Sequence, residues 1–420
     1  MKQVTVFLFC IYLFLAPPGA LAGDSPDKGQ SSFLSSLSTS EYMTGNWGGL
    51  RDRLIEWGLT PTVEYSATLQ GNPVGGMRKG IKYAGLLDVY LDFDLEKLLR
   101  LGGTRLVVSG AWAYGENLSA HDIGNFFTVS NDFNGKFVGL YQLFIETNLW
   151  KDRLTFAVGR MGIGDDFGTA DVFGIYVSAV VNVNPISLSY NIPAYLSNPD
   201  AALGARIRVE PVRDFYIAAG VYNADPDAAV NQEVSIDVDF TFDDGVIMIS
   251  EIGYTPGRDA DSAGLPGDYK FGAYYDTGEF NDLSSEENSR EGNYGFYVIT
   301  DQMVYREPGK VSQGLTLWAA ATYAPEEEIN VFPFFVASGF TYEGVFTGRD
   351  NDVAGFSFAY GRLSRDLEDQ DYEIGIEGTY NFQVTPWLGI QPDLQLIVHP
   401  GGSGSIPDAL VAGMQLSVDI

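Results

Sequence analysis

Charged side chains recur at every second position of several segments, where they could bind a polar solute. The stretch LLDVYLDFDL, residues 86–95, shows this pattern most clearly. Because successive side chains of a strand point to opposite faces, it predicts a strand with one acidic and one apolar face. The acidic face would carry Asp88, Tyr90, Asp92 and Asp94, and the apolar face Val89, Leu91, Phe93 and Leu95. In a soluble sandwich the apolar face would turn into a core, whereas in a membrane barrel it would face lipid.

Arginines occupy alternating positions in two further segments. In TRLVVSGAWAYG, residues 104–115, Arg105 and Ser109 share one face, and in LGARIRVE, residues 203–210, Arg206 and Arg208 share a face with Glu210. A guanidinium offers five N–H donors, and an ionised carboxylate offers only acceptors. A surface that carries both groups indicates binding of hydroxyl-rich molecules.

Residues for catalysis or metal binding are scarce. The histidines are His121 and His399, and Cys10 is the only cysteine. The sequence contains no G-x-S-x-G nucleophile motif, no dinucleotide-binding fingerprint after a strand and no Walker loop. We therefore expect no enzymatic activity, no metal and no cofactor. The 55 acidic residues nevertheless leave room for a glycosidase carboxylate pair. A secreted or periplasmic all-β glycosidase or sugar-binding protein therefore remains the alternative, as does a non-transporting structural barrel.

The first residues predict export. A basic start at Lys2, an apolar run over residues 4–15 and an Ala-Leu-Ala site before Gly23 are typical of a secretory signal peptide, residues 1–22. Residues 23–60 form a predicted N-terminal periplasmic segment with a short amphipathic helix, in which Leu50, Leu54 and Trp57 share a stripe. Residues 61–420 would then form one domain. The net charge of −30 disfavours nucleic acid as a partner.

The rest of the chain is predicted to form strands. Alternation predicts sixteen of them, an even number and mostly long enough to cross a bilayer when tilted. Short turns around Lys151, Val212 and Thr385 alternate with long connections, as in bacterial outer-membrane barrels. A soluble all-β protein remains the competing interpretation. The predicted strands are 61–70, 83–95, 104–115, 139–149, 153–160, 203–210, 214–222, 246–254, 268–278, 294–306, 313–324, 332–343, 353–362, 371–382, 387–398 and 410–420.

Aromatic residues at the predicted strand ends favour the barrel, because such residues form girdles at membrane interfaces. They are Tyr222, Tyr254, Tyr323, Tyr342, Tyr360, Tyr380 and Trp387.

Five ordered blocks resemble a known family. TGNWGGLRDRLIEWGLTP, YAGLLDVYLDFDLEKLLRLGGTRLVVSG, DQMVYREPG, VTPWLGIQPDLQLIVHPGG and SIPDALVAGMQLSVDI are similar to the carbohydrate-selective outer-membrane porins of the OprB type. The resemblance implies an all-β, single transmembrane antiparallel barrel of about sixteen strands that passes sugars such as glucose by diffusion. Two departures stand out: the chain ends in Ile420 where such barrels usually end in an aromatic residue, and the loop at 161–202 has no cysteine pair.

The resemblance also implies partners and an orientation. Small carbohydrates, outer-membrane lipid, lipopolysaccharide and the barrel-assembly machinery would be the partners, and a homo-oligomer is compatible with it. Both termini and the short turns would be periplasmic, whereas the segments around Asn131, Asn182 and Asp282 would face the outside.

A closed barrel would turn Val89, Leu91, Phe93 and Leu95 to lipid and leave an aqueous lumen rather than a packed core. Parity then places Lys270, Tyr274 and Asp276 on the lumen side as well. We hypothesise that the long loop opening with GDDF folds inward and sets its acids against the arginines. The candidate pore-lining, sugar-contacting residues are Arg105, Asp165, Asp166, Phe167, Arg206, Arg208, Asp88, Asp92 and Glu146.

Overall fold

A computed structural model describes residues 39–132, 135–225, 242–258 and 264–420. The predicted signal peptide and the first part of the predicted N-terminal segment lie outside the described residues. Within the described part of the chain, no helix is both long and apolar enough to cross a membrane.

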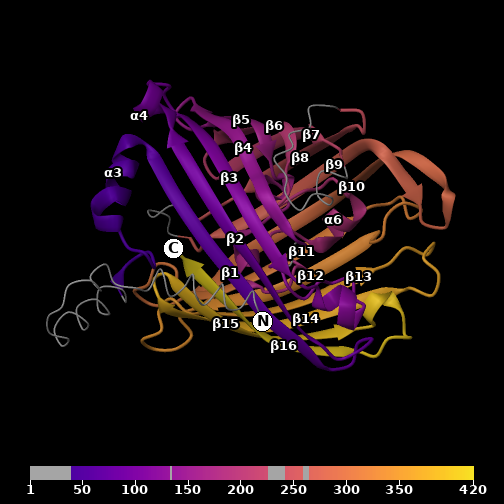
Figure 1. The fold of residues 1–420 in the computed structure, drawn as a ribbon. Helices are drawn as coiled ribbons and strands as arrows, with labels where there is room; N and C mark the ends of the chain where they lie inside the picture. The colour runs from indigo at the N-terminus through magenta and orange to yellow at the C-terminus, as the bar shows by residue number, and fades with distance from the viewer. Residues whose placement is uncertain (1–38, 133–134, 226–241, 259–263) are drawn as a thin grey trace.

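In the described part of the chain, sixteen antiparallel strands form one closed barrel, in which each strand pairs with its sequence neighbours and β1 pairs with β16 (Figure 1). This confirms the predicted fold class, and every predicted strand overlaps an observed one. The strands are β1 Leu59–Val74, β2 Ile81–Asp94, β3 Thr104–Gly115, β4 Phe137–Leu149, β5 Leu154–Met161, β6 Ala202–Val212, β7 Phe215–Asn223, β8 Val246–Tyr254, β9 Gly267–Asp282, β10 Ser285–Arg306, β11 Gly314–Tyr323, β12 Phe334–Glu343, β13 Val353–Arg362, β14 Tyr372–Thr385, β15 Leu388–Val398 and β16 Ala409–Asp419.

The two ends of the barrel differ. We call the end where β1 begins and β16 finishes the terminal rim, and the opposite end the loop rim. The predicted alternation of short and long connections holds only in part. On the terminal rim, residues 150–153, 213–214 and 386–387 are tight turns, but residues 255–266 form a longer connection. On the loop rim, residues 283–284 are the tight turn of a long β9–β10 hairpin. The start of β10 at Ser285 rather than at residue 294 reflects this extension.

Short helices interrupt the connections. On the terminal rim, α3 precedes β1 and α4 joins β2 to β3. The others lie in loops of the loop rim, apart from η1, which precedes α3. The helices are η1 Trp47–Gly49, α3 Leu50–Trp57, α4 Leu95–Leu99, η2 Ser119–Ile123, α5 Ile163–Asp166, η3 Asp171–Ile175, α6 Ile186–Asn191 and η5 Pro400–Gly402.

The end of β2 departs from the sequence prediction. Val89 is exposed on the outer face, as expected, but Leu95 is buried because it is the first residue of α4 rather than the last of a strand. Asp94 caps this helix by accepting hydrogen bonds from the backbone N–H groups of Glu96 and Lys97. A capping carboxylate stabilises a helix start, so the carboxylate of Asp94 serves the first turn of α4.

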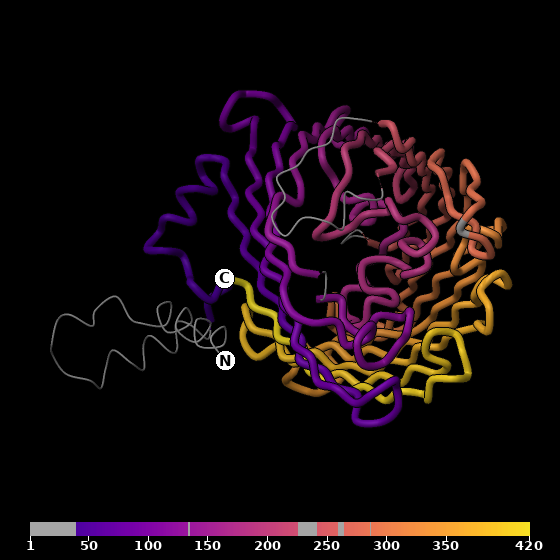
Figure 2. Tube along the Cα trace, turned by 45° about the vertical axis from the view of Figure 1, so that its right-hand side comes forward, coloured from indigo at the N-terminus to yellow at the C-terminus, as the bar shows by residue number. Residues whose placement is uncertain are grey.

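The lumen is not simply aqueous. The loop of residues 162–201 folds into the barrel, and Figure 2 shows this part of the chain inside the ring of strands. Its apolar side chains pack against inward-facing residues of β7 to β13 and form one buried cluster, which includes Phe173, Trp318 and Phe335. The inward fold of the long loop agrees with the hypothesis, but the expectation of a lumen without a packed core was wrong, because the inner faces of these strands carry many apolar side chains. Tyr222, expected at a membrane interface, is also fully buried inside.

We predict that deleting residues 412–420 abolishes insertion into the membrane. The deletion removes most of β16, which pairs with both β15 and β1. Unpaired backbone groups would then face hydrocarbon, at a cost of several kcal/mol each. Heat-modifiable migration in detergent gels measures the folded fraction. Ile420→Phe is the matched control, since it changes the last residue and keeps the strand, and it should fold at least as well as the wild type. A truncated chain that still reached the outer membrane folded would refute the closed register.

We also predict that the loop rim faces the outside of the cell. A cysteine at Asp282, on the exposed β9–β10 hairpin, should react with an impermeant maleimide on intact cells, whereas one at Lys151 should react only after lysis. Asn131 and Asn182 are poorer reporters than the sequence suggested, since they are half-buried on loops that contact each other. Labelling at position 151 but not at position 282 on intact cells would show that the barrel has the opposite orientation.

Candidate functional site

Five charged side chains form a continuous row across the inner wall, from β2 to the folded-in loop. Asp92 Oδ2 lies 2.9 Å from Arg105 Nη1, and Arg105 Nε donates to Glu146 Oε1 at 2.8 Å. Glu146 Oε2 accepts from Arg206 Nη2 at 2.5 Å, and Arg206 Nε lies 2.6 Å from Asp166 Oδ2. Acid and base alternate along this row, which we call the charge row. It contains three carboxylates and two guanidinium groups.

The register of the strands explains how the charge row crosses β5. Glu146 on β4 pairs with Ala157 on β5, and Ala157 pairs with Arg206 on β6. Side chains of directly paired residues lie on the same face of a sheet. The single methyl group of the fully buried Ala157 leaves room above β5, so the guanidinium of Arg206 can reach the carboxylate of Glu146.

The charge row borders a lumen cavity of about 590 Å³. Small-molecule sites commonly measure roughly 300–1,000 Å³, so a sugar of one or a few rings would fit. The cavity lies against the inner faces of β1 to β6 and borders the apolar cluster, to which its lining residues Val107, Phe144 and Met161 also belong. Its lining residues are Thr60, Thr62, Glu64, Tyr90, Asp92, Arg105, Val107, Gln142, Phe144, Met161, Asp165, Asp166 and Arg206.

The loop supplies two adjacent carboxylates from the short helix α5. Asp165 accepts hydrogen bonds from the hydroxyl of Tyr141 and, at 2.6 Å, from the amide of Gln142. The side chain of Asp165 faces the lumen, but the residue lies deep inside the barrel. Burial by the surrounding protein is the main cause that raises the pKa of its carboxyl group to about 7. Burial also raises the pKa of Asp166 to about 6, although the nearby Arg206 opposes the rise. Both groups therefore titrate closer to neutrality than ordinary aspartates.

The structure separates three predicted residues from the charge row. Phe167 is only 1% exposed and packs edge-on against Tyr222 in the apolar cluster, so it offers no face to a solute. Arg208 stacks over the ring of Tyr216, with 3.6 Å between the guanidinium carbon and the ring centroid, and it pairs with Glu210 rather than with the loop acids. Asp88 is buried on β2, outside the set of described residues that line the cavity.

Lys270, Tyr274 and Asp276 face inward, as parity predicted, but none of them is among the described residues that line the cavity. Tyr274 and Asp276 are buried, and the ammonium of Lys270 donates to the carbonyl of Thr169 at 2.7 Å. Tyr90 also lines the cavity, although it was not among the predicted pore-lining residues. It shares the parity of Asp88 and Asp92, so the signal was present.

Inward-facing carboxylates fix the loops through their backbone N–H groups. Glu377 accepts from the N–H groups of Val177 and Ser178, at 2.7 and 3.3 Å. Glu251 accepts from the N–H of Gly168 and from two tyrosine hydroxyls, and Glu373 accepts from three N–H groups of two other loops. A buried carboxylate needs such donors, so these strand residues determine where the loops lie.

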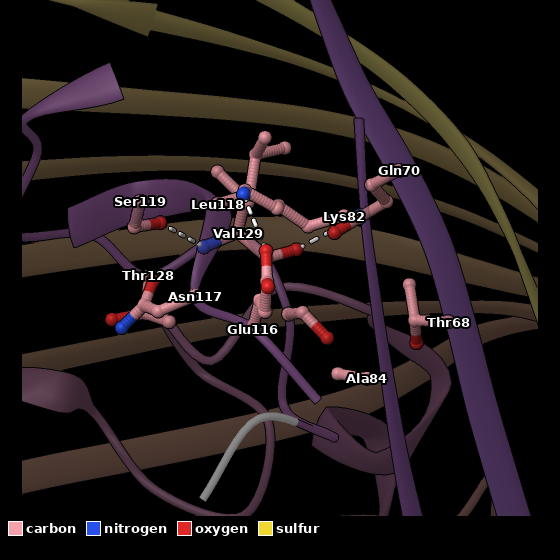
Figure 3. Close-up of a pocket in the computed structure, with 11 residues that line it drawn as sticks. Thr68, Gln70, Lys82, Ala84, Glu116, Asn117, Leu118, Ser119, Thr128 and Val129 are labelled. Atoms are coloured by element: carbon pink, nitrogen blue, oxygen red, sulfur yellow. Dashed lines mark hydrogen bonds and ion pairs between the residues drawn. The ribbon is translucent and has the colours of Figure 1, made fainter. Parts of the chain in front are cut away.

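A second, much smaller pocket lies farther toward the loop rim (Figure 3). It measures about 10 Å³, and its lining includes the ion pair between Lys82 and Glu116. That volume is about one water molecule, so the pocket is too small for a sugar. Among the described residues, no group of three or more His, Cys, Asp or Glu side chains could hold a metal ion.

Comparisons with known proteins agree with the barrel. The family model described as "Carbohydrate-selective porin, OprB family" matches residues 78–419. Porin B of Pseudomonas aeruginosa is 27% identical, over 90% of this chain and 91% of its own length. The putative porin QuiX of Acinetobacter baylyi is 23% identical, over 90% of this chain and 93% of its own. The high-pH structure of Pseudomonas putida OprB superimposes with a TM-score of 0.84 at 25% identity, covering 91% of this chain and 99% of that one.

We predict that the ion selectivity of the pore changes with pH between about 8 and 5. The pKa values of Asp165 and Asp166 are raised to about 7 and about 6, so acidification through this range protonates both groups and removes negative charge from the cavity. Preference for cations should therefore fall, and the reversal potential in a salt gradient measures it. The double variant Asp165→Asn, Asp166→Asn should show a flatter profile. A variant as pH-dependent as the wild type would assign the titration to other groups.

Proposed function

The chain belongs to the OprB family of carbohydrate-selective outer-membrane porins, and we propose that its cavity passes small neutral sugars of the glucose type by passive diffusion. The candidate selectivity site is the charge row together with Asp165 and the ring of Tyr90. The proposal includes no catalytic step and no cofactor. Both termini would lie on the periplasmic side, and the outer face of the barrel would contact lipid and lipopolysaccharide after insertion by the barrel-assembly machinery.

The alternating charges of the row are the observation that carries this proposal. Guanidinium groups donate and carboxylates accept, so neighbouring members can bind adjacent hydroxyl groups of one sugar ring. The members already hold one another at 2.5 to 2.9 Å, which keeps their side chains in place before a solute arrives. A wall of carboxylates alone would attract cations, whereas alternating charges create a transverse field that orients hydroxyl dipoles.

The apolar part of the cavity adds a second feature. Tyr90 is half-buried and receives a hydrogen bond on its hydroxyl from Asn198 of the loop, at 3.2 Å. This contact fixes the ring beside Asp92, where a sugar could stack on its face. The cavity therefore offers donors, acceptors and a flat surface, which are the three features that sugars require.

Affinity should be weak, as passage requires. Each charge-assisted hydrogen bond between the sugar and the wall contributes roughly 1.5–3 kcal/mol. A sugar that enters the pore also loses its hydrogen bonds to water, and this loss offsets most of that gain. The charged groups also satisfy one another without a solute. The site would therefore favour sugars over apolar solutes while releasing them readily.

We predict that Arg206→Ala impairs sugar block whereas Arg208→Ala does not. Arg206 joins Glu146 to Asp166, so its loss should raise cation selectivity and weaken sugar block of the ion current about tenfold, which corresponds to about 1.4 kcal/mol. Arg208 lies two residues away on the same strand and pairs with Glu210, so its loss should leave sugar block nearly unchanged. Sugar-blocked conductance in planar bilayers measures both variants. Equal effects, or no effect of Arg206→Ala, would move the selectivity site elsewhere in the lumen.

A further inference from the structure

The short helix α3 has an apolar stripe with no partner among the described residues. Leu50 and Trp57 on this stripe are 43% and 65% exposed, and Leu54 between them is half-buried. Residues at positions i, i+4 and i+7 share one helix face. Asp52 and Glu56 lie on the opposite face, so the helix is amphipathic. Exposed tryptophan and leucine on one stripe need an apolar environment or a polar–apolar boundary.

The helix is fixed beside the barrel wall rather than across its opening. Figure 2 shows the indigo chain that contains α3 outside the ring of strands. The buried Arg51 donates to the carbonyl of Ile420 at 2.8 Å, and its guanidinium carbon lies 3.7 Å from the ring centroid of Tyr42. These contacts use the side of α3 that carries Arg51 and leave the stripe uncovered.

Helix α4 extends the same surface. The ammonium of Lys97 donates to the carbonyl of Ile55 at 3.1 Å, which joins the two helices. Gly58, with a φ of 101°, makes this contact possible, since a Cβ there would lie 3.1 Å from the carbonyl oxygen of Asp94 and from Lys97 Cβ. Three leucines around the end of α4 are exposed: Leu98 at 45%, Leu99 at 64% and Leu101 at 49%.

This apolar surface is continuous with the lipid-facing surface of the barrel. Because α4 connects β2 directly to β3, its leucines follow Phe93 on the outer face of β2 and precede Leu106 on the outer face of β3. The outer faces of β2 to β4 carry exposed apolar side chains down to Leu149 at the terminal rim. The stripe of α3 and the leucines of α4 therefore begin where the lipid-facing band ends.

We propose that α3 and α4 form a membrane-interface platform that lies in the headgroup region of the bilayer leaflet at the terminal rim. Leu50, Trp57, Leu98, Leu99 and Leu101 would enter the boundary between headgroups and acyl chains. The predicted periplasmic segment would then be partly a lipid-binding element. It would also clamp the barrel where β1 meets β16, because Arg51 ties α3 to Ile420.

Apolar burial rather than charge would hold the platform in the membrane. Four cations belong to α3, α4 and the flanking residues, and four carboxylates balance them. The cations are Arg51, Arg53, Lys97 and Arg100, and the acids are Asp52, Glu56, Asp94 and Glu96. Binding should therefore depend little on the fraction of anionic lipid, unlike that of a basic amphipathic helix.

Depth-dependent quenching tests the platform in the full barrel. Single cysteines replace Leu50, Leu99 or, as the matched control on the opposite face of α3, Glu56. Each carries an environment-sensitive fluorophore, and heat-modifiable migration verifies that each variant has folded. The barrels are reconstituted in phosphatidylcholine vesicles with bromine atoms near the headgroup end of the acyl chains, with and without phosphatidylglycerol.

The labels at positions 50 and 99 should lose at least about half of their emission in brominated lipid, whereas the label at position 56 should lose little. Phosphatidylglycerol should not change this difference. Equal quenching at all three positions, or none, would overturn the proposal. Quenching that is lost as protein density rises would assign the surface to a second copy of the chain and would also overturn the proposal. None of these readings depends on sugar transport, so failure here leaves the proposed pore function intact.

Discussion

The need to pair every backbone N–H and C=O group inside hydrocarbon governs this structure. The pairing of β1 with β16 removes the last open edge, and closure forces one face of every strand outward to lipid and the other inward. Charged side chains are then confined to the interior or to the rims. Inward carboxylates such as Glu377 must find donors there, and Glu377 finds them in the backbone of the folded-in loop.

The interior has a packed part and an open part, and Val107, Phe144 and Met161 border both. On the β7 to β13 side, the loop of residues 162–201 packs against apolar wall residues and forms a core of the kind found in soluble proteins. On the β1 to β6 side, the wall keeps its charges, and the space beside it remains open. The same loop therefore supplies apolar residues to the packed half and Asp165 and Asp166 to the open half. The position of the pore follows from where the loop is attached.

Alternation together with the family resemblance predicted the strands, because a two-residue period sustained along a segment matches the geometry of a strand and not that of a helix. Parity together with loop length also anticipated that Asp166 would meet Arg206, with Arg105 nearby. Parity could not distinguish Arg206 from Arg208, since both point inward and only their height along β6 separates them. It also could not show that Phe167 would be buried, because the loop's path depends on distant residues such as Glu251. The filling of the lumen was missed for a related reason: inward alanines and aromatics look the same in sequence as outward ones.

Ala157 illustrates how charge selectivity can change without any change in charge. This residue is not among the described residues that line the cavity and carries no polar side-chain atom, yet the gap above it allows Arg206 to reach Glu146 across the intervening strand. A bulkier neutral side chain there would separate the two halves of the charge row and leave each arginine with its own nearest acid. Related porins could thus diverge in solute preference through the size of one apolar residue, while every charged residue stayed the same.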